Sequence, residues 1–146
     1  MLITSVEAKY LKIIYKLEKE GIPLVGAKVM ASILSVSRPS AHEILLKLRD
    51  KGFLEHYPRK GFRLSKSGRR LAKRLVRNHK IIETMLVIIA GISVDEACRC
   101  AENIELKLPS NVIEKIFESI GRPECCPHGE PIPPLEECAE MIEDVC

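Results

Sequence analysis

The sequence predicts a mainly α protein in which a winged helix-turn-helix is followed by an all-helical domain. Three segments with helical spacing precede a short hairpin pattern, and later segments again show helical spacing. Charge also separates along the chain: residues 1–80 hold 19 Lys and Arg against 6 Asp and Glu, and residues 81–146 hold 4 against 14. The 146 residues suffice for one or two small domains. We place these domains at residues 1–66 and 67–146.

The first three helices follow from caps and apolar spacing. Thr4 to Glu7 has the pattern of a capping box, and apolar residues then recur until Gly21. A second helix fits residues 25–34, and a third fits residues 37–50, with a proline tolerated in its first turn.

A hairpin and five further segments complete the chain. Residues 53–57 and 62–64 flank a polar, Gly-containing tip, which predicts two paired strands forming the wing. A connector helix then fits about 67–90. The later segments are a helix from Ser93 to about Leu108, another from Pro109 to Gly121, a proline-rich ordered loop or arm over 122–134, and a short helix over 135–145.

Several function classes are disfavoured by composition. Nothing resembles a signal peptide, and the longest apolar run, Met85–Ala90, is far shorter than the ~20 residues that span a bilayer. We therefore expect a soluble, cytoplasmic protein with no membrane partner. All six cysteines lie in the acidic half, where they are expected as thiols or ligands in a reducing compartment. No catalytic set is evident, so we expect no enzymatic activity.

The basic half predicts binding to double-stranded DNA. The second helix of a helix-turn-helix enters the major groove, and here that helix starts at Ser37. Ala41 is small enough to meet a thymine methyl, Glu43 suits a cytosine donor and Lys47 suits a phosphate. The alternative is that these residues form an ordinary solvated surface. The predicted contacts are Ser37, Arg38, Pro39, Ser40, Ala41, His42, Glu43 and Lys47 on the helix, and Arg59 and Lys60 at the wing tip.

The acidic half contains a candidate metal site. His79 and Glu83 lie four residues apart on the connector helix, and Cys98, Glu102 and Glu105 share one face of the next helix. If the helices pack together, three carboxylates converge, and a divalent cation is the simplest compensation. The alternative is a set of surface acids with a small core cysteine and a capping histidine.

An ordered set of short motifs covers nearly the whole chain. The set consists of Tyr10-Leu11-x-x-Ile14-Tyr15-x-Leu17-Glu18-x-Glu20-Gly21, Ser37-x-Pro39, Gly52-Phe53-Leu54, Leu64-Ser65-x-x-Gly68, His79-x-x-x-Glu83, Asp95-Glu96-Ala97-Cys98 and Cys126-Pro127-His128-Gly129-x-Pro131-Ile132-Pro133. Together these motifs resemble the diphtheria toxin repressor family of iron- and manganese-dependent transcriptional repressors. The resemblance implies a helical metal-binding and dimerisation domain, in the two-domain form without the SH3-like domain.

The resemblance also implies metal ligands. His79 and Glu83 match ligands of one family site, and Cys98 stands where a further His often completes it. Glu102 and Glu105 match ligands of an adjacent site.

Two departures affect that adjacent site. Leu106 replaces its usual His, and Lys9 replaces Met or Asp. We hypothesise that Lys9 pairs with Glu102 or Glu105 in place of a metal.

We therefore predict a homodimeric, metal-dependent repressor of metal homeostasis genes that binds a palindromic operator. Fe²⁺ is the favoured metal, Mn²⁺ the next, and Zn²⁺ or Co²⁺ are further options. Two alternatives stay open: a winged-helix regulator that senses thiol redox state, and a metal-binding protein-interaction module that does not bind DNA. Cys125, Cys126 and His128 suggest a separate zinc or redox site, but we favour a structural role for them.

Overall fold

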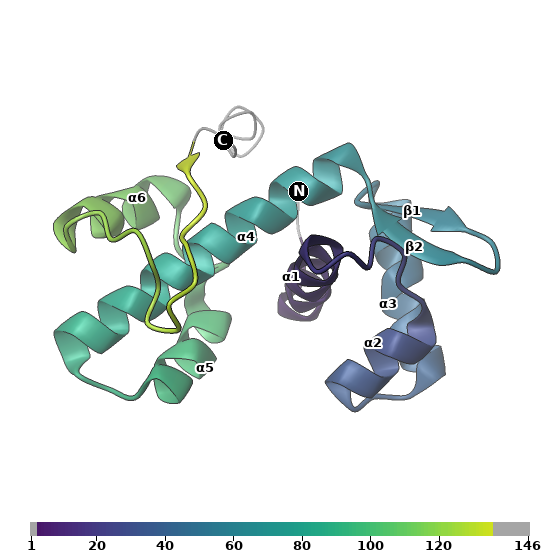
Figure 1. The fold of residues 1–146 in the computed structure, drawn as a ribbon, viewed down its shortest axis with the longest axis horizontal. Helices are drawn as coiled ribbons and strands as arrows, with labels where there is room; N and C mark the ends of the chain where they lie inside the picture. The colour runs from purple at the N-terminus through teal and green to yellow at the C-terminus, as the bar shows by residue number, and fades with distance from the viewer. Residues whose placement is uncertain (1–2, 136–146) are drawn as a thin grey trace. The chain divides into compact units, whose positions relative to one another are not determined.

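The computed structural model describes residues 3–135 and confirms the predicted fold class, a mainly helical chain with one two-stranded sheet (Figure 1). The short helix predicted over 135–145 lies outside the described residues, apart from Leu135. The elements are α1 (Ser5–Lys19), α2 (Ala27–Leu34), α3 (Arg38–Asp50), β1 (Leu54–Tyr57), β2 (Gly61–Leu64), α4 (Lys66–Met85), the π-helix η1 (Leu86–Ala90), α5 (Val94–Ile104) and α6 (Ser110–Ser119).

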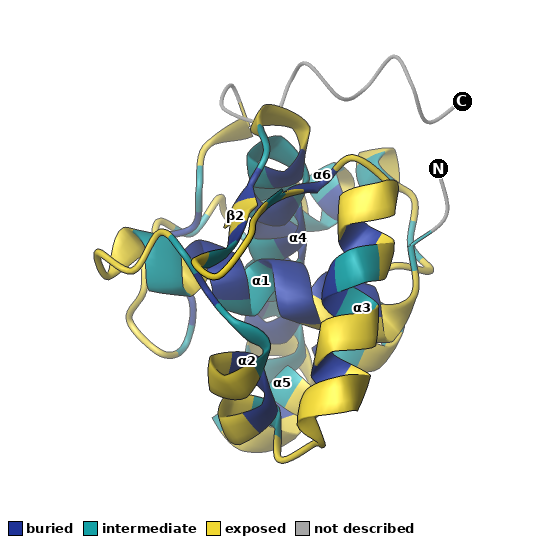
Figure 2. Ribbon diagram, turned by 90° about the vertical axis from the view of Figure 1, so that its right-hand side faces the viewer, coloured by how far each residue is buried: buried dark blue, intermediate teal, exposed yellow. Residues whose placement is uncertain are grey.

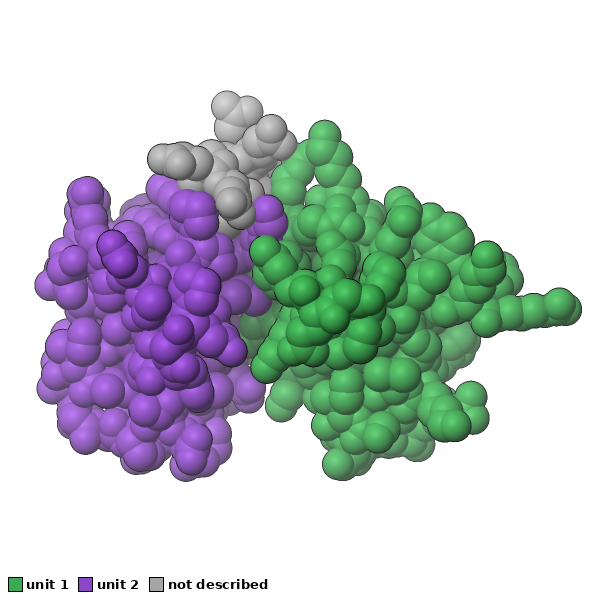
Figure 3. Space-filling view, in the orientation of Figure 1, with its two compact units in different colours: residues 1–72, 143–146 green, residues 73–142 purple. Residues whose placement is uncertain are grey.

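The chain forms two compact units, which Figure 3 colours separately. The division lies inside α4, between Ala72 and Lys73, whereas the sequence led us to end the first domain at residue 66. We call residues 3–72 the N-terminal unit and residues 73–135 the C-terminal unit. Among the helices of the described residues, none is long and apolar enough to cross a membrane.

A buried carboxylate fixes the start of α1, where the predicted capping box is confirmed. The Thr4 hydroxyl accepts a hydrogen bond from the Glu7 amide at 3.1 Å, and the Glu7 carboxylate accepts one from the Thr4 amide at 2.9 Å. Glu7 is only 2% exposed. Its carboxylate also receives the Lys51 ammonium at 2.8 Å, immediately after α3. One side chain thus joins the beginning of α1 to the end of α3.

The predicted helix-turn-helix is formed by α2 and α3. Ser35 ends α2 in the left-handed region with φ 54°, and Ser37 caps α3 by accepting a hydrogen bond from the Ser40 amide at 3.2 Å. Met30 and Leu45 are fully buried on the inner faces of the two helices.

The wing is an antiparallel hairpin, as predicted, with Leu54 opposite Leu64. The second helix starts later than its predicted first residue, Val25, because the amide and carbonyl of Val25 both bond to Phe62 of β2 at 2.9 Å. This second pairing, of Val25 with β2, requires a glycine at position 61. A Cβ atom there would lie 2.8 Å from the Val25 carbonyl oxygen, and φ is +118°.

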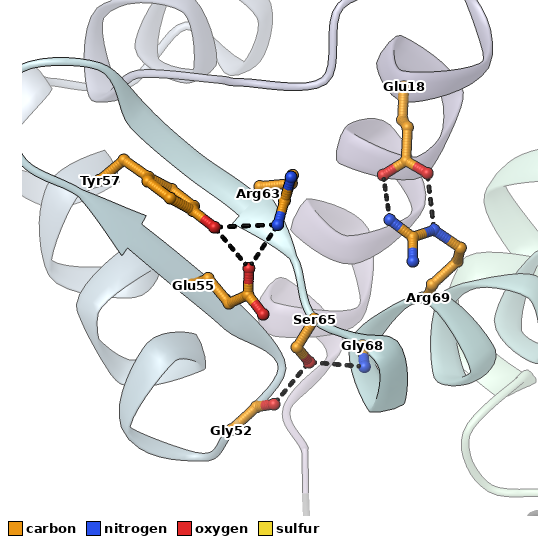
Figure 4. Close-up of polar contacts among 8 residues, drawn as sticks. All are labelled: Glu18, Gly52, Glu55, Tyr57, Arg63, Ser65, Gly68 and Arg69. Carbon is orange, nitrogen blue, oxygen red and sulfur yellow. Dashed lines mark hydrogen bonds and ion pairs between the residues drawn. The ribbon is translucent and has the colours of Figure 1, made fainter.

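The first turn of α4 is held against the rest of the N-terminal unit by the Ser65 side chain and by close packing at Gly68 (Figure 4). The Ser65 hydroxyl donates to the Gly52 carbonyl at 2.6 Å and accepts from the Gly68 amide at 3.0 Å. A Cβ atom on Gly68 would lie 1.9 Å from the Phe53 carbonyl oxygen. The glycine in the predicted Leu64-Ser65-x-x-Gly68 motif is therefore a requirement of packing.

The helices of the C-terminal unit differ from the prediction at two ends. The connector does not stay α-helical to Ala90, because α4 ends at Met85 and a π-helix continues to Ala90, where Gly91 closes it with φ 65°. α5 ends at Ile104 instead of about Leu108. The chain leaves the helix in a tight turn, in which the Lys107 amide bonds to the Ile104 carbonyl at 3.0 Å.

A buried arginine orders the proline-rich loop of this unit, which is ordered as predicted. Arg77 is 3% exposed. Its guanidinium donates to the Glu114 carboxylate at 2.8 Å and to the Pro133 carbonyl at 2.6 Å, and it stacks over the Phe117 ring at 4.5 Å. The apolar core beside it contains Ile81, Ile82, Ala101, Ile113, Cys126 and Ile132.

Replacing Gly68 by Ala should destabilise the chain by about 2 kcal/mol or more, because a backbone carbonyl cannot rotate away from the added methyl group. Urea unfolding measures this cost. Gly26→Ala is the matched control, because a Cβ atom at Gly26 meets nothing within 4 Å, and it should cost at most about 1 kcal/mol. Equal costs for the two variants would contradict the packing role of Gly68.

Glu7 should make stability depend on pH. Burial opposes ionisation of its carboxyl, but hydrogen bonds from Lys51 and the Thr4 amide outweigh burial and hold its pKa below the usual 4.5. A lowered pKa in the folded state stabilises the fold above the pKa of the unfolded chain, and this stabilisation is lost as pH falls through the folded value. Glu7→Gln retains a capping side chain. It should lower stability at pH 7 and flatten the loss of stability below pH 4.5.

Urea unfolding from pH 7 to acid pH tests this expectation. Glu43→Gln is the control, because Glu43 is exposed and its ion pair with Lys47 lies at the surface. The control should keep the pH dependence of the unmodified chain. An unchanged acid limb in Glu7→Gln would show that Glu7 is not the linked group.

Candidate metal centre and nucleic-acid interface

Two helices of the C-terminal unit bring the first predicted ligands together. His79 and Glu83 lie one turn apart on α4, and Cys98 lies on α5. The His79 Nε2 atom is 3.4 Å from the Cys98 sulfur and 3.5 Å from a Glu83 carboxylate oxygen. One donor atom from each residue falls within 4.8 Å of the others, as metal ligands require. The structure thus groups three of the five predicted ligands.

Glu83 is the most constrained of these residues. It is 1% exposed, and its Oε2 atom is the only buried side-chain nitrogen or oxygen atom of the described residues that makes no hydrogen bond, although His79 Nε2 lies 3.5 Å from it. Burial opposes ionisation, but the contacts with the imidazoles of His79 and His128 outweigh it and lower the pKa of the Glu83 carboxyl. A carboxylate with an unsatisfied buried oxygen beside a thiol and an imidazole suits a bound cation.

The proline-rich loop supplies a second donor group, which the sequence indicated as an alternative but did not connect to Glu83. Glu83, Cys126 and His128 also offer donor atoms within 4.8 Å of one another, and the His128 Nδ1 atom lies 3.1 Å from Glu83 Oε1. Cys126 and His128 are therefore candidate ligands, beside the structural role that the sequence favoured for them. The Cys-Pro-His spacing was the available signal, but only the folded loop places it against Glu83.

Cys126 differs from its neighbour Cys125. Cys126 is buried, and burial first, followed by the adjacent Glu83 carboxylate, raises the pKa of its thiol. Cys125 is exposed and belongs to neither donor group. A buried thiol with a raised pKa is unlike the exposed, low-pKa cysteine of a redox sensor.

The two remaining predicted ligands lie outside both donor groups of the described chain. Glu105 is 3% exposed, and its Oε2 atom lies 2.6 Å from His79 Nδ1, the ring nitrogen opposite the one that faces Cys98. Glu102 is half-buried on α5. The hypothesis that Lys9 neutralises one of these carboxylates stays a prediction.

The donor types indicate the class of ion that fits. The two groups contain two imidazoles, two thiols and one shared carboxylate. Imidazole and thiolate suit Zn²⁺, Co²⁺ and Fe²⁺, whereas a site for Mn²⁺ is typically richer in oxygen. The residues therefore fit a divalent transition metal.

The predicted DNA-contacting residues lie on an exposed face of the N-terminal unit, with one exception. Ser37, Arg38, Pro39, Ser40, His42, Glu43, Lys47, Arg59 and Lys60 are all exposed, and Figure 2 shows the exposed outer face of α3. Ala41 is fully buried. The prediction that its methyl group meets a thymine is therefore wrong, because Ala41 lies on the inner face of α3.

Polar contacts organise the wing beside this surface (Figure 4). The Arg63 guanidinium donates to the Glu55 carboxylate and to the Tyr57 hydroxyl, both at 2.9 Å. The His56 ring stacks on Phe62 with 4.3 Å between the centroids. These contacts fix both faces of the short hairpin that carries Arg59 and Lys60 at its tip.

A winged helix-turn-helix followed by a helical unit with clustered imidazole, thiol and carboxylate donors defines a class of metal-linked DNA-binding proteins. Two family models match the chain in the same order. The N-terminal DNA binding domain of iron dependent repressors matches residues 1–62, and their metal binding and dimerisation domain matches residues 65–134. The chain belongs to the iron-dependent repressor family, as its motifs indicated.

Individual relatives agree with this assignment. The diphtheria toxin repressor of Corynebacterium jeikeium is 32% identical over 139 residues, which cover 92% of this chain and 56% of that protein. The chain thus spans about half the length of the curated relatives it matches. The manganese regulator SloR matches with a TM-score of 0.80 at 32% identity, over 88% of this chain and 59% of SloR. A hypothetical protein from Sulfolobus solfataricus matches with a TM-score of 0.73 at 28% identity, over 90% of this chain and all of that one.

The second donor group yields a direct prediction about two adjacent cysteines. Cys126→Ser should weaken Co²⁺ binding at least about tenfold and remove the sulfur-to-metal absorption that Cys126 contributes, because serine is a poor ligand for this ion. Cys125→Ser should leave both unchanged. Absorption-monitored Co²⁺ titration of the metal-free chain measures affinity and absorption together. Equal behaviour of the two variants would remove Cys126 from the ligand set.

Proposed function

We propose that this chain is a metal-dependent transcriptional repressor that binds a palindromic DNA operator as a homodimer in the cytoplasm. The observation that carries the proposal is the buried Glu83 carboxylate, which is shared by two groups of side chains able to ligate a metal and whose Oε2 atom makes no hydrogen bond. Family membership supports DNA binding and regulation, and we propose no enzymatic activity.

The proposed ligands form two groups that share Glu83, one with His79 and Cys98 and the other with Cys126 and His128. A bound divalent transition ion supplies positive charge and a fixed geometry at this point. The ligands belong to α4, α5 and the proline-rich loop, so their joint use restrains three segments of the C-terminal unit. Because α4 begins in the N-terminal unit, we infer that this restraint reaches the DNA-binding unit through α4.

The proposed DNA contacts divide by chemistry. Ser40 and His42, in the first turns of α3, suit base edges, whereas Lys47 and Arg59 suit phosphates. Lys47 pairs with Glu43 at 3.0 Å across an exposed surface, so its ammonium is available to a phosphate at small cost. The charge of the first 80 residues, 19 basic against 6 acidic, favours association with DNA.

Exposed apolar side chains support the proposed dimer. Ile88 and Ile89 of the π-helix are 59% and 72% exposed, although both are large aliphatic residues in the C-terminal unit. Exposed aliphatic residues of this size are typical of surfaces that a partner covers. The palindromic operator follows, because a two-fold dimer presents two recognition helices to two half-sites.

Metal-dependent DNA binding is the test. Metal-free protein, purified without oxygen, is used to select duplexes from a pool with a randomised centre in the presence of Fe²⁺, and anisotropy then measures affinity with Fe²⁺, Mn²⁺, Zn²⁺, Co²⁺ or chelator. We expect at least one metal to raise affinity for the selected duplex about tenfold or more. Glu83→Ala should abolish that response because it removes the shared ligand.

Lys47→Ala is the control for the DNA surface. It should weaken binding to all duplexes and lower the salt dependence by roughly one unit, because one phosphate contact is lost, while the metal response persists. DNA binding that ignores metal but responds to thiol oxidation would favour a redox regulator. The absence of any DNA binding would leave a metal-binding interaction module.

A further inference from the structure

Glu105 occupies a position that the proposed ligand set does not use. Its carboxylate is 2% exposed and lies 2.6 Å from His79 Nδ1, whereas the other ring nitrogen, Nε2, faces Cys98 and Glu83. We propose that Glu105 is a positioning residue that fixes the tautomer and the ring orientation of His79. This inference rests on the proposed metal site.

The tautomer follows from hydrogen-bonding capacity. A carboxylate only accepts hydrogen bonds, so the neutral His79 ring must carry its proton on Nδ1 to bond with Glu105. The Nε2 lone pair is then directed to the side of the ring where the Cys98 sulfur lies at 3.4 Å. A neutral histidine binds a metal only through the nitrogen that lacks a proton. Glu105 thus prepares His79 Nε2 as a ligand before any metal arrives.

The same geometry separates Glu105 from the ligands themselves. The imidazole ring stands between the Glu105 carboxylate and the donor atoms of Glu83 and Cys98, and neither donor group of the described residues includes Glu105. The site that the family resemblance assigns to Glu105 also has Leu106 in place of its usual His. In this chain Glu105 therefore acts on the metal through His79.

The expected size of the effect follows from this indirect role. Carboxylates that hold a metal-bound histidine typically raise metal affinity by 10–100-fold. Glu105 comes from the end of α5 and His79 from α4, so the bond also restrains two elements that carry ligands. Loss of the bond frees the ring to rotate and to carry its proton on either nitrogen.

Co²⁺ titration of the full-length chain and of two variants tests the proposal. Glu105→Leu removes the acceptor and should weaken Co²⁺ binding by about 10–100-fold. Glu105→Gln keeps an acceptor oxygen without the charge and should lose less. At saturation both variants should show the absorption bands of the unmodified chain, because the ligands are unchanged. Altered bands at saturation would mean that Glu105 is itself a ligand.

Nitrogen-15 spectra of the histidine ring in the metal-free chain provide the second readout, which a purely structural role would not move. The unmodified chain should show His79 protonated on Nδ1, and Glu105→Leu should show a mixture of tautomers. A proton on Nε2 in the unmodified chain would overturn the proposal. Failure of the unmodified chain to bind Co²⁺ would instead count against the metal site, while the ring spectra would still decide the role of Glu105.

Discussion

The C-terminal unit depends on how it keeps one carboxylate charged inside protein. Burial of an ionised Glu83 costs free energy, which His128 offsets at Oε1 and which His79 offsets at Oε2 only when its ring is protonated. The compensation is incomplete when His79 is neutral, because Oε2 then makes no hydrogen bond. A fold that keeps such an atom in its interior contains a built-in preference for a cation at that point. Both α5 and the proline-rich loop bring donor atoms to this one carboxylate.

Helix α4 connects the buried Glu83 carboxylate to the rest of the chain. Its first turn packs closely against Phe53 in the N-terminal unit, and only a glycine at position 68 avoids a collision there. Its later turns carry His79 and Glu83. Arg77, between these two regions, holds the loop that contains Cys126 and His128 through Pro133. One helix therefore packs against the N-terminal unit, holds the proline-rich loop and carries two of the candidate metal ligands.

Local features were predictable from sequence, and long-range ones were not. The capping box of Thr4 and Glu7 and the pairing of His79 with Glu83 follow from spacing within one helix. The approach of Cys126 to Glu83 depends on a loop that Arg77 holds in place. An irregular loop has no periodic pattern of apolar residues from which this contact could be predicted. Ala41 lies on the buried face of α3, although its size suited a base contact. The bond from Glu105 to His79 joins two elements, so spacing within one helix could not predict it.

The central claim is that Glu83 gathers thiol and imidazole ligands around a transition metal, and X-ray absorption of the chain loaded with one equivalent of Zn²⁺ tests it most directly. We expect sulfur at about 2.3 Å together with nitrogen or oxygen at about 2.0–2.2 Å. In Glu83→Gln the same equivalent of Zn²⁺ should lose this mixed shell. A zinc shell made only of oxygen and nitrogen in the unmodified chain, or one unchanged by Glu83→Gln, would contradict the account.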